Sequence, residues 1–174
     1  MKPIKIVNNL FYIPVVIIVL CTFARILFFA KVSGDSMNPT FSDGDLIFVL
    51  PVTNNINYGD IVVTSSDIRY GESIIKRVIA LENDTVFIDF STGQVFVNGE
   101  PLNETYIAEP AYVYGDVIFP LTVPEGTVFL LGDNRNHSID SRYSSVGCVP
   151  VSELDKKYIS LFGHYYTTMG VTEP

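Results

Sequence analysis

The chain has 174 residues, enough for one compact domain with a buried core and a small additional segment. Its formal net charge of −8 is unevenly distributed, because all 19 acidic residues lie at or beyond Asp35. From Val32 onward the chain holds seven basic and 19 acidic residues, a net charge of −12. A domain of that charge repels nucleic acid, so nucleic acid is excluded as a partner.

The first predicted element is a membrane span near the N-terminus. Residues 10–30 (LFYIPVVIIVLCTFARILFFA) hold one charge, Arg25, in 21 positions. As a helix they extend about 31 Å, the thickness of a bilayer core, if Arg25 reaches toward the far interface. A cleavable signal peptide is the alternative, but the run is long and no clean A-x-A site follows it. Lys2 and Lys5 precede the span, which predicts a cytoplasmic N-terminus and an acidic domain on the other side.

A serine in a turn follows the apolar run. Ser36 in VSGDSMNPTF is flanked by the turn-forming residues Gly34, Asp35 and Pro39. Most serines in such turns only bond to their own backbone or to a neighbouring N–H group. A catalytic serine needs a base nearby, because its hydroxyl alone is a weak nucleophile.

Beyond this turn, short apolar runs alternate with Gly, Pro, Asn and Asp, which is typical of a mainly β fold. The expected strands are residues 45–50, 60–64, 73–80, 85–89, 94–97, 113–119 and 127–131. Thr92-Gly93 and Asn98-Gly99 are turn signals, so residues 85–102 predict one compact β-hairpin. Residues 151–162 (VSELDKKYISLF) open with Ser-x-x-Asp and predict a short helix.

One expected strand carries a lysine among apolar residues. In SIIKRVIAL, Lys76 shares one face with Ile74 and Val78, and Ile75 and Arg77 lie on the other. Burial lowers the pKa of a lysine from about 10.4, which makes Lys76 a candidate general base. A charge that protects an exposed strand edge from aggregation is the alternative.

A polar segment, residues 132–143 (GDNRNHSIDSRY), follows the last of these strands. It is either a solvated loop or a hydrogen-bonded platform in which carboxylates pair with guanidinium groups. The chain has two histidines, His137 and His164, and two cysteines, Cys21 and Cys148. Their spacing fits neither a disulfide framework nor a metal site, and we expect no metal and no cofactor.

Four blocks, in this order after the predicted anchor, resemble the type I signal peptidase family: GDSMNPTF, YGDIVV, SIIKRVIAL and GDNRNHSIDSR. The similarity covers most of residues 10–150. It implies a signal-peptidase-like β-fold catalytic domain with an N-terminal transmembrane helix. Residues 1–31 would be the cytoplasmic N-terminus and membrane anchor, and residues 32–174 the extracytoplasmic catalytic domain. A minimal inserted β-hairpin region at about 84–130 matches the compact Gram-positive branch.

The resemblance also implies roles for individual residues. Ser36 is the expected nucleophile and Lys76 its general base. Ser138 matches the hydroxyl that orients the lysine, and Asp140 with Arg142 matches a buried pair that supports the site. The residues expected to line the pockets for small side chains are Val32, Met37, Phe41 and Ile75. The chain departs from many relatives at Gly34, where they have a serine that donates to the oxyanion.

The function implied is that of a membrane-bound serine endopeptidase that removes signal peptides from exported preproteins, cutting after small-x-small motifs. The expected partners are preprotein signal peptides, membrane lipid and the secretion translocase. The expected location is a bacterial cell membrane, crossed once, with the catalytic domain outside the cytoplasm.

Three other functions and one other base compete with this interpretation. A self-cleaving repressor-type protease shares a serine–lysine dyad, but the anchor, the GDNR block and the lack of a DNA-binding segment oppose it. A non-catalytic signal-peptidase-like assembly factor for pili or surface proteins remains the alternative, although Ser36 and Lys76 are both present. A structural β-rich surface protein does not need the platform. A triad of Ser36, His137 and Asp140 is disfavoured, because His137 and Ser138 point to opposite sides of an extended segment.

Overall fold

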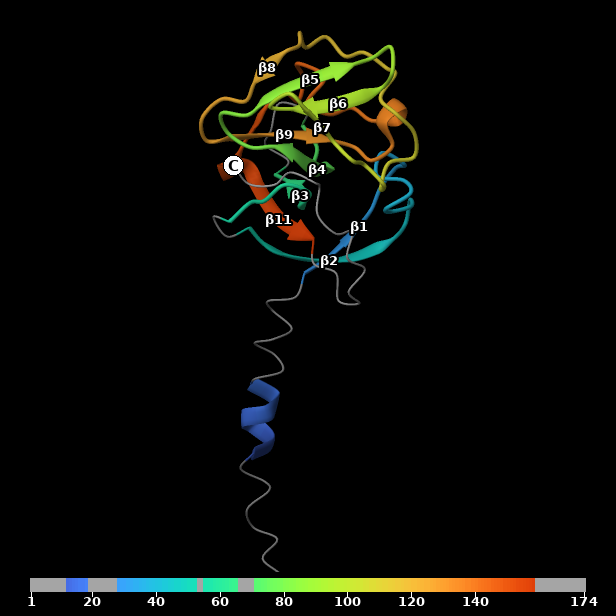
Figure 1. Ribbon diagram of the computed structural model, residues 1–174. Coiled ribbons are helices and arrows are strands. Elements are labelled where there is room, and N and C mark those ends of the chain that lie inside the picture. The colour runs from blue at the N-terminus through green and yellow to red at the C-terminus, as the bar shows by residue number, and fades with distance from the viewer. Residues whose placement is uncertain (1–11, 19–27, 53–54, 66–70, 159–174) are drawn as a thin grey trace, which may run out of the picture.

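The computed structural model describes residues 12–18, 28–52, 55–65 and 71–158, which form a mainly β domain after a short helical segment (Figure 1). Residues 12–18 are helical, and among the described residues no helix is long and apolar enough to cross a membrane. The strands form two antiparallel sheets, with the orders β1-β2-β11-β3-β4-β9-β10 and β7-β6-β5-β8.

The large sheet consists of β1 (Phe28–Lys31), β2 (Leu46–Pro51), β3 (Ile61–Thr64), β4 (Ile75–Ala80), β9 (Thr127–Leu131), β10 (Val149–Pro150) and β11 (Leu154–Tyr158). The small sheet consists of β5 (Thr85–Asp89), β6 (Gln94–Val97), β7 (Glu100–Pro101) and β8 (Leu121–Thr122). Two short 3-10 helices complete the described elements, η1 (Arg135–His137) and η2 (Val151–Glu153).

Six of the expected strands are confirmed as β2, β3, β4, β5, β6 and β9, with ends that differ by at most two residues. The predicted hairpin over residues 85–102 continues into a third strand, because β7 pairs back on β6. Asn98 and Gly99 make this second turn with φ values of 54° and 86°. Positive φ at both central residues gives the turn the twist that adjacent strands need.

The strand expected at residues 113–119 is wrong. This segment is irregular, and its backbone bonds to the 132–143 segment instead of to a neighbouring strand. The N–H groups of Tyr112 and Val113 both donate to Asn136 Oδ1, and the N–H of Val117 donates to Arg142 O. Tertiary contacts therefore satisfy the backbone groups that a strand ladder would have used.

The helix expected at residues 151–162 is also wrong over its described part. After η2, residues 154–158 form β11, which lies between β2 and β3 in the large sheet. Leu154 is buried in one apolar cluster with Val62 and Val78, so this segment supplies a strand that the sheet needs at that position. The Ser-x-x-Asp signal is local and is overridden by pairing with two distant strands. Residues 159–162 lie outside the described residues.

The last residues of the predicted membrane span belong to a β-strand in the structure. Residues 28–31 are the strand β1, which pairs with β2 from Phe28 opposite Val49 to Lys31 opposite Leu46. The sheet therefore begins before Val32, the expected start of the catalytic domain. Residues 10, 11 and 19–27, with Arg25 and Cys21, lie outside the described part of the chain.

The core has three parts, two of which meet at β4 and β9. The first lies between the two sheets and includes Ile79, Val86, Val95 and Phe129. The second underlies the turn at Ser36 and includes Val32, Met37 and Phe41, and the third includes Val62, Val78 and Leu130. Because β4 lies between β3 and β9 and contributes to two of these clusters, it is a central strand and not an edge.

The pairing of β1 with β2 predicts that β1 belongs to the folded domain. Two truncated chains, one that begins at residue 26 and one that begins at Val32, both lack the apolar run but differ in β1. We expect the shorter chain to unfold about 5 °C lower, since it loses four residues of pairing and the packing of Ala30 on the second cluster. Thermal unfolding followed by circular dichroism measures this, and equal midpoints would show that β1 does not stabilise the domain.

Candidate active site

Lys76 and Ser36, which are 40 positions apart in the chain, are in direct contact. Lys76 Nζ donates to Ser36 Oγ at 2.7 Å and to Ile75 O at 2.9 Å. Lys76 lies on the central strand β4 and is only 3% exposed. A lysine that protects an exposed strand edge would extend into solvent, so that alternative for Lys76 is wrong.

Burial changes the protonation of Lys76. Desolvation lowers its pKa from 10.5 to about 8, although Asp140 and Asp133 act in the opposite direction and favour the charged form. A lysine with this pKa is uncharged in an appreciable fraction of molecules near neutral pH. The uncharged amine can accept a proton from the hydroxyl that it contacts.

Apolar residues of the turn before β2 anchor Ser36 to the core of the domain. Met37 and Phe41, which follow Ser36 in the turn, are buried at 1% and 7% exposure in the second apolar cluster. Gly34 has a φ of 81°, a conformation that residues with a side chain rarely adopt, and its N–H donates to Asp43 Oδ1 at 2.8 Å. Ser36 itself is half-buried, with its hydroxyl directed to Lys76.

The segment after β9, residues 132–143, holds the turn from the other side, and we call it the 132–143 loop. Asn134 donates its backbone N–H to Ser36 O at 3.0 Å and its side-chain amide to Asp35 O at 3.1 Å. At Gly132 a Cβ atom would lie 2.5 Å from Ser36 O and 2.3 Å from Ser138 Oγ. Glycine is therefore required at position 132 for the loop to approach the serine so closely.

Ser138 is buried in this contact, but its Oγ has no hydrogen-bond partner in the described part of the chain. The bond from this hydroxyl to Lys76 that the resemblance implies is therefore not formed in this structure. A buried hydroxyl without a partner is unfavourable by about 1–3 kcal/mol. This unfavourable group lies beside the turn that holds Ser36.

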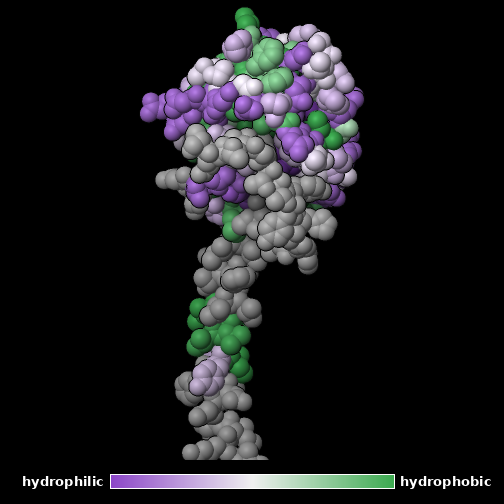
Figure 2. All heavy atoms as spheres, in the orientation of Figure 1, coloured by the Kyte–Doolittle hydropathy of each residue, from purple (hydrophilic) through white to green (hydrophobic). Residues whose placement is uncertain are grey.

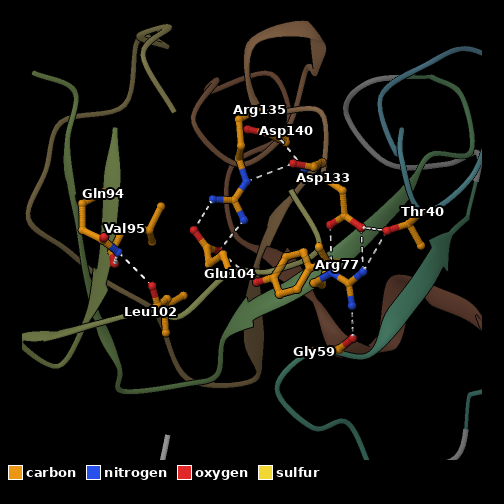
Figure 3. Close-up of polar contacts among 12 residues, drawn as sticks. Thr40, Gly59, Arg77, Gln94, Val95, Leu102, Glu104, Asp133, Arg135 and Asp140 are labelled. Carbon is orange, nitrogen blue, oxygen red and sulfur yellow. Dashed lines mark hydrogen bonds and ion pairs between the residues drawn. The ribbon is translucent and has the colours of Figure 1, made fainter. Parts of the chain in front are cut away.

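Three buried ion pairs fix the 132–143 loop. Figure 3 shows two of them, Arg77 with Asp133 and Arg135 with Glu104. Arg77 binds both carboxylate oxygens of Asp133, at 2.8 and 2.6 Å, and Arg142 binds both of Asp140, at 2.8 and 2.9 Å. Arg135 Nη1 donates to Glu104 Oε2 at 2.6 Å. The predicted pair of Asp140 and Arg142 thus exists, and the platform interpretation of the loop is supported over a solvated loop.

Each pair also binds the surrounding backbone. Asp140 accepts the N–H of Gly132 at 3.1 Å, and Arg142 donates to the carbonyl of Val113 at 3.0 Å. Arg77 donates to Gly59 O at 2.9 Å and lies 4.0 Å from the centre of the Tyr106 ring. These contacts tie β4, the 132–143 loop and the segments around Tyr106 and Val113 into one unit around Lys76.

Sequence reasoning missed the part that Glu104 and Tyr106 play in the site. Tyr106 donates its hydroxyl to Glu104 at 2.9 Å, and burial raises the pKa of this phenol so that it stays a neutral donor. Glu104 and Tyr106 lie in the irregular stretch NETY, where no spacing or periodicity marks them. Thr40, whose hydroxyl donates to Asp133, lies in the GDSMNPTF block. Its place in that block could have marked it as a residue of the site.

A cleft of about 510 Å³ opens beside the serine and lysine. Three of the four residues expected in the substrate pockets, Val32, Met37 and Ile75, line it, whereas Phe41 packs behind them in the second cluster. His137 and Ile139 line it as well. His137 therefore lies near Ser36, but the hydrogen bond to the serine hydroxyl comes from Lys76.

Residues 12–18, 28–52, 55–65 and 71–158 contain no group of three or more His, Cys, Asp or Glu side chains that could hold a metal ion. Cys148 is a free thiol that lines a second cavity of about 550 Å³. Burial raises the pKa of this thiol, which makes it a poor nucleophile.

Comparisons with known proteins agree with one another. A family model described as signal peptidase, peptidase S26, matches residues 5–161. The chain is 34% identical over 140 residues to signal peptidase I of Bacillus amyloliquefaciens, covering 74% of this chain and 73% of that one. It is 35% identical over 142 residues to signal peptidase I S of Bacillus subtilis strain 168, covering 74% of each. A crystal structure of a signal peptidase I from Enterococcus faecalis V583 matches with a TM-score of 0.51 at 30% identity, over 63% of this chain and all of that one.

The buried ion pairs predict a specific loss of stability. Replacing Glu104→Gln leaves the Arg135 guanidinium, which is 0% exposed, without a full counter-charge. We expect this change to lower the free energy of unfolding by about 3 kcal/mol, because an unpaired buried charge is strongly unfavourable. Urea denaturation measures it.

Glu109→Gln is the matched control, since Glu109 is exposed in the same irregular segment and its loss should change stability by less than about 0.5 kcal/mol. Equal stabilities for the two variants would mean that the Glu104–Arg135 pair does not hold the loop.

Proposed function

The chain belongs to the signal peptidase I family of serine endopeptidases, peptidase S26, whose substrates are preprotein signal peptides, and from this premise we propose that it cuts them with Ser36 as nucleophile and Lys76 as general base. One observation carries the proposal. A lysine that is 3% exposed donates to the serine hydroxyl at 2.7 Å, and burial lowers its pKa to about 8. An assembly factor without catalytic activity has no need to keep this contact.

The reaction follows from the chemistry of the pair. Uncharged Lys76 takes the proton from Ser36 Oγ as that oxygen attacks the carbonyl carbon of the scissile bond. The peptide nitrogen then leaves with the proton from Lys76, and an ester joins the signal peptide to Ser36. Lys76, uncharged again, takes a proton from a water molecule that attacks the ester, and it gives that proton to Ser36 Oγ as the signal peptide leaves, which restores the enzyme.

The oxyanion that forms in this reaction needs hydrogen-bond donors, and we propose the Ser36 backbone N–H as one of them. Gly34 offers no hydroxyl, and its N–H donates to Asp43 Oδ1 at 2.8 Å. The N–H of Gly34 is therefore already used in holding the turn. A second N–H group or a water molecule takes the place of the serine hydroxyl of many relatives.

The cleft supports a preference for small side chains before the cut. Val32, Met37 and Ile75 line it with apolar atoms, and Phe41 closes it from behind. In the described part of the chain β1 pairs only with β2, so its other edge is open for an extended peptide. A strand added there would bring its side chains alternately into the cleft, which suits a small-x-small motif.

The family is membrane-anchored, and we propose that the apolar run from Leu10 supplies a single-pass anchor here. Lys2 and Lys5 then favour a cytoplasmic N-terminus, with the sheets on the extracytoplasmic side. We further propose residues 84–130 as the minimal inserted region, with membrane lipid and the secretion translocase as partners. The contacts of Glu104 and Tyr106 support the view that this region belongs to the catalytic unit.

Three single substitutions test the assignment of the base. Ser36→Ala and Lys76→Ala should each lower kcat on a preprotein by at least about 1,000-fold, because each removes one member of the reacting pair. His137→Ala should keep most of the activity, since Lys76 and not His137 bonds to the serine. Cleavage assays with the full chain in detergent measure this. If Lys76→Ala keeps nearly normal activity and His137→Ala is inactive, the result supports the triad of Ser36, His137 and Asp140 and contradicts the lysine base.

The pH dependence follows from the sign of the shift at Lys76. The amine is the active form, so kcat/KM should rise with pH up to about 8 and level off above it, where the lysine with a pKa of about 8 has lost its proton. At pH values well below 8, each further drop of one pH unit should lower the rate about tenfold. A rate that is already level above about pH 6.5 to 7 would fit a histidine base and contradict a lysine.

A further inference from the structure

An exposed apolar surface lies outside the cleft, on the irregular segment that was expected to be a strand. Tyr112, Val113, Tyr114 and Ile118 are 48%, 40%, 67% and 86% exposed, and we call these four residues the apolar ridge. Figure 2 shows apolar residues at the surface of the end of the domain where β5 and β8 lie. Four large apolar side chains within seven positions are more than the scattered exposure of an ordinary surface.

The ridge is held rigidly although it has no regular secondary structure. Asn136 Oδ1 accepts the N–H groups of Tyr112 at 2.9 Å and Val113 at 3.0 Å. The ring of Tyr114 stacks on Phe90 with centroids 4.1 Å apart. A Cβ at Gly115 would lie 1.9 Å from Arg142 O, so the backbone there is pressed against the 132–143 loop. A rigid apolar surface loses little conformational entropy when a peptide binds to it.

The ridge and the cleft are connected through the 132–143 loop. Asn136, which holds the ridge, is followed at once by His137, which lines the cleft with Ile139. Ile139, at the edge of the cleft, is itself 44% exposed. The 132–143 loop therefore lines one edge of the cleft and also binds the backbone of the ridge.

We propose that the apolar ridge binds the mature segment of the preprotein, the part that follows the scissile bond; this rests on the proposed function. The signal-peptide side of the cut occupies the wall formed by Val32, Met37 and Ile75. The chain beyond the cut leaves along the wall of His137 and Ile139, which leads to the ridge. In Figure 1, β1 lies at one end of the domain and β8 at the other, so this path also carries the mature segment away from the end where the chain enters the sheet.

The charges beside the ridge define the class of peptide that it takes. Glu109 and Asp116 are exposed in the same segment, and hydrogen bonds from Ser144 lower the pKa of Asp116, which keeps it charged. The ridge therefore fits an extended segment with an apolar or aromatic side chain and a neutral or basic flank. Acidic mature segments are disfavoured by repulsion.

Two synthetic substrates separate this proposal from the catalytic one. Both carry the same signal peptide with an Ala-x-Ala cleavage motif; one ends about two residues after the cut, and the other continues with about 20 residues that include Phe and Lys. The enzyme is the full chain in detergent, as wild type, as Tyr112→Ser/Ile118→Ser, and as Phe87→Ser. Phe87 is 43% exposed on β5 and is the matched control for loss of surface apolar area.

For the double variant we expect KM for the long substrate to rise about tenfold with kcat nearly unchanged, and no change on the short substrate. Phe87→Ser should match wild type on both. An unchanged KM on the long substrate overturns the proposal and leaves the catalytic assignment intact. Equal losses on both substrates would mean structural damage, and they also overturn it.

Two further outcomes would assign the ridge or the serine a different role. If the double variant has normal KM in detergent but binds less well to vesicles of anionic phospholipid, the ridge contacts lipid and the proposal is wrong. If Ser36→Ala still cuts both substrates at the wild-type rate, the catalytic assignment fails, and the proposal about the ridge fails with it.

Discussion

The burial of one lysine beside one serine is the constraint on which the rest of this structure depends. Desolvation holds the pKa of Lys76 at about 8 instead of 10.5, which is unfavourable for the charged form by about 3 kcal/mol. A chain tolerates this only where the lysine cannot turn out to solvent. Pairing with β3 and β9 fixes the backbone of β4, and hydrogen bonds to Ser36 Oγ and Ile75 O hold the buried amine of Lys76 in place.

The carboxylates near Lys76 create a second requirement. Asp140 and Asp133 each raise the pKa of Lys76 and so act against the desolvation that lowers it. Each is bound at both oxygens by an arginine, Asp140 by Arg142 and Asp133 by Arg77. The charge of Arg142 lowers the pKa of Lys76, so Arg142 favours the uncharged lysine, and its ion pair with Asp140 also helps to fix the 132–143 loop. The loop in turn holds the backbone of the Ser36 turn through Asn134.

Much of this arrangement could be predicted from the sequence, and the failures have physical reasons. Six strands were found because alternation along a strand is local, and Ser36 and Lys76 were found because their blocks resemble a known family. The strand β11 was missed because its conformation is set by two distant strands, against a helix signal within the segment. Glu104 was missed because its importance comes from Arg135, 31 positions away, and no periodicity connects the two.

The most direct test is the protonation of Lys76 itself. The full chain, labelled with ¹³C at the lysine ε carbons and kept in detergent, can be titrated by NMR, with the Lys76 signal assigned by its loss in Lys76→Met. We predict that this signal titrates near pH 8, because burial lowers the pKa of Lys76 to about 8. If Lys76 instead titrates at about 10.4, the value of a lysine in water, its side chain is not held in an apolar environment. It then cannot be the base that activates Ser36.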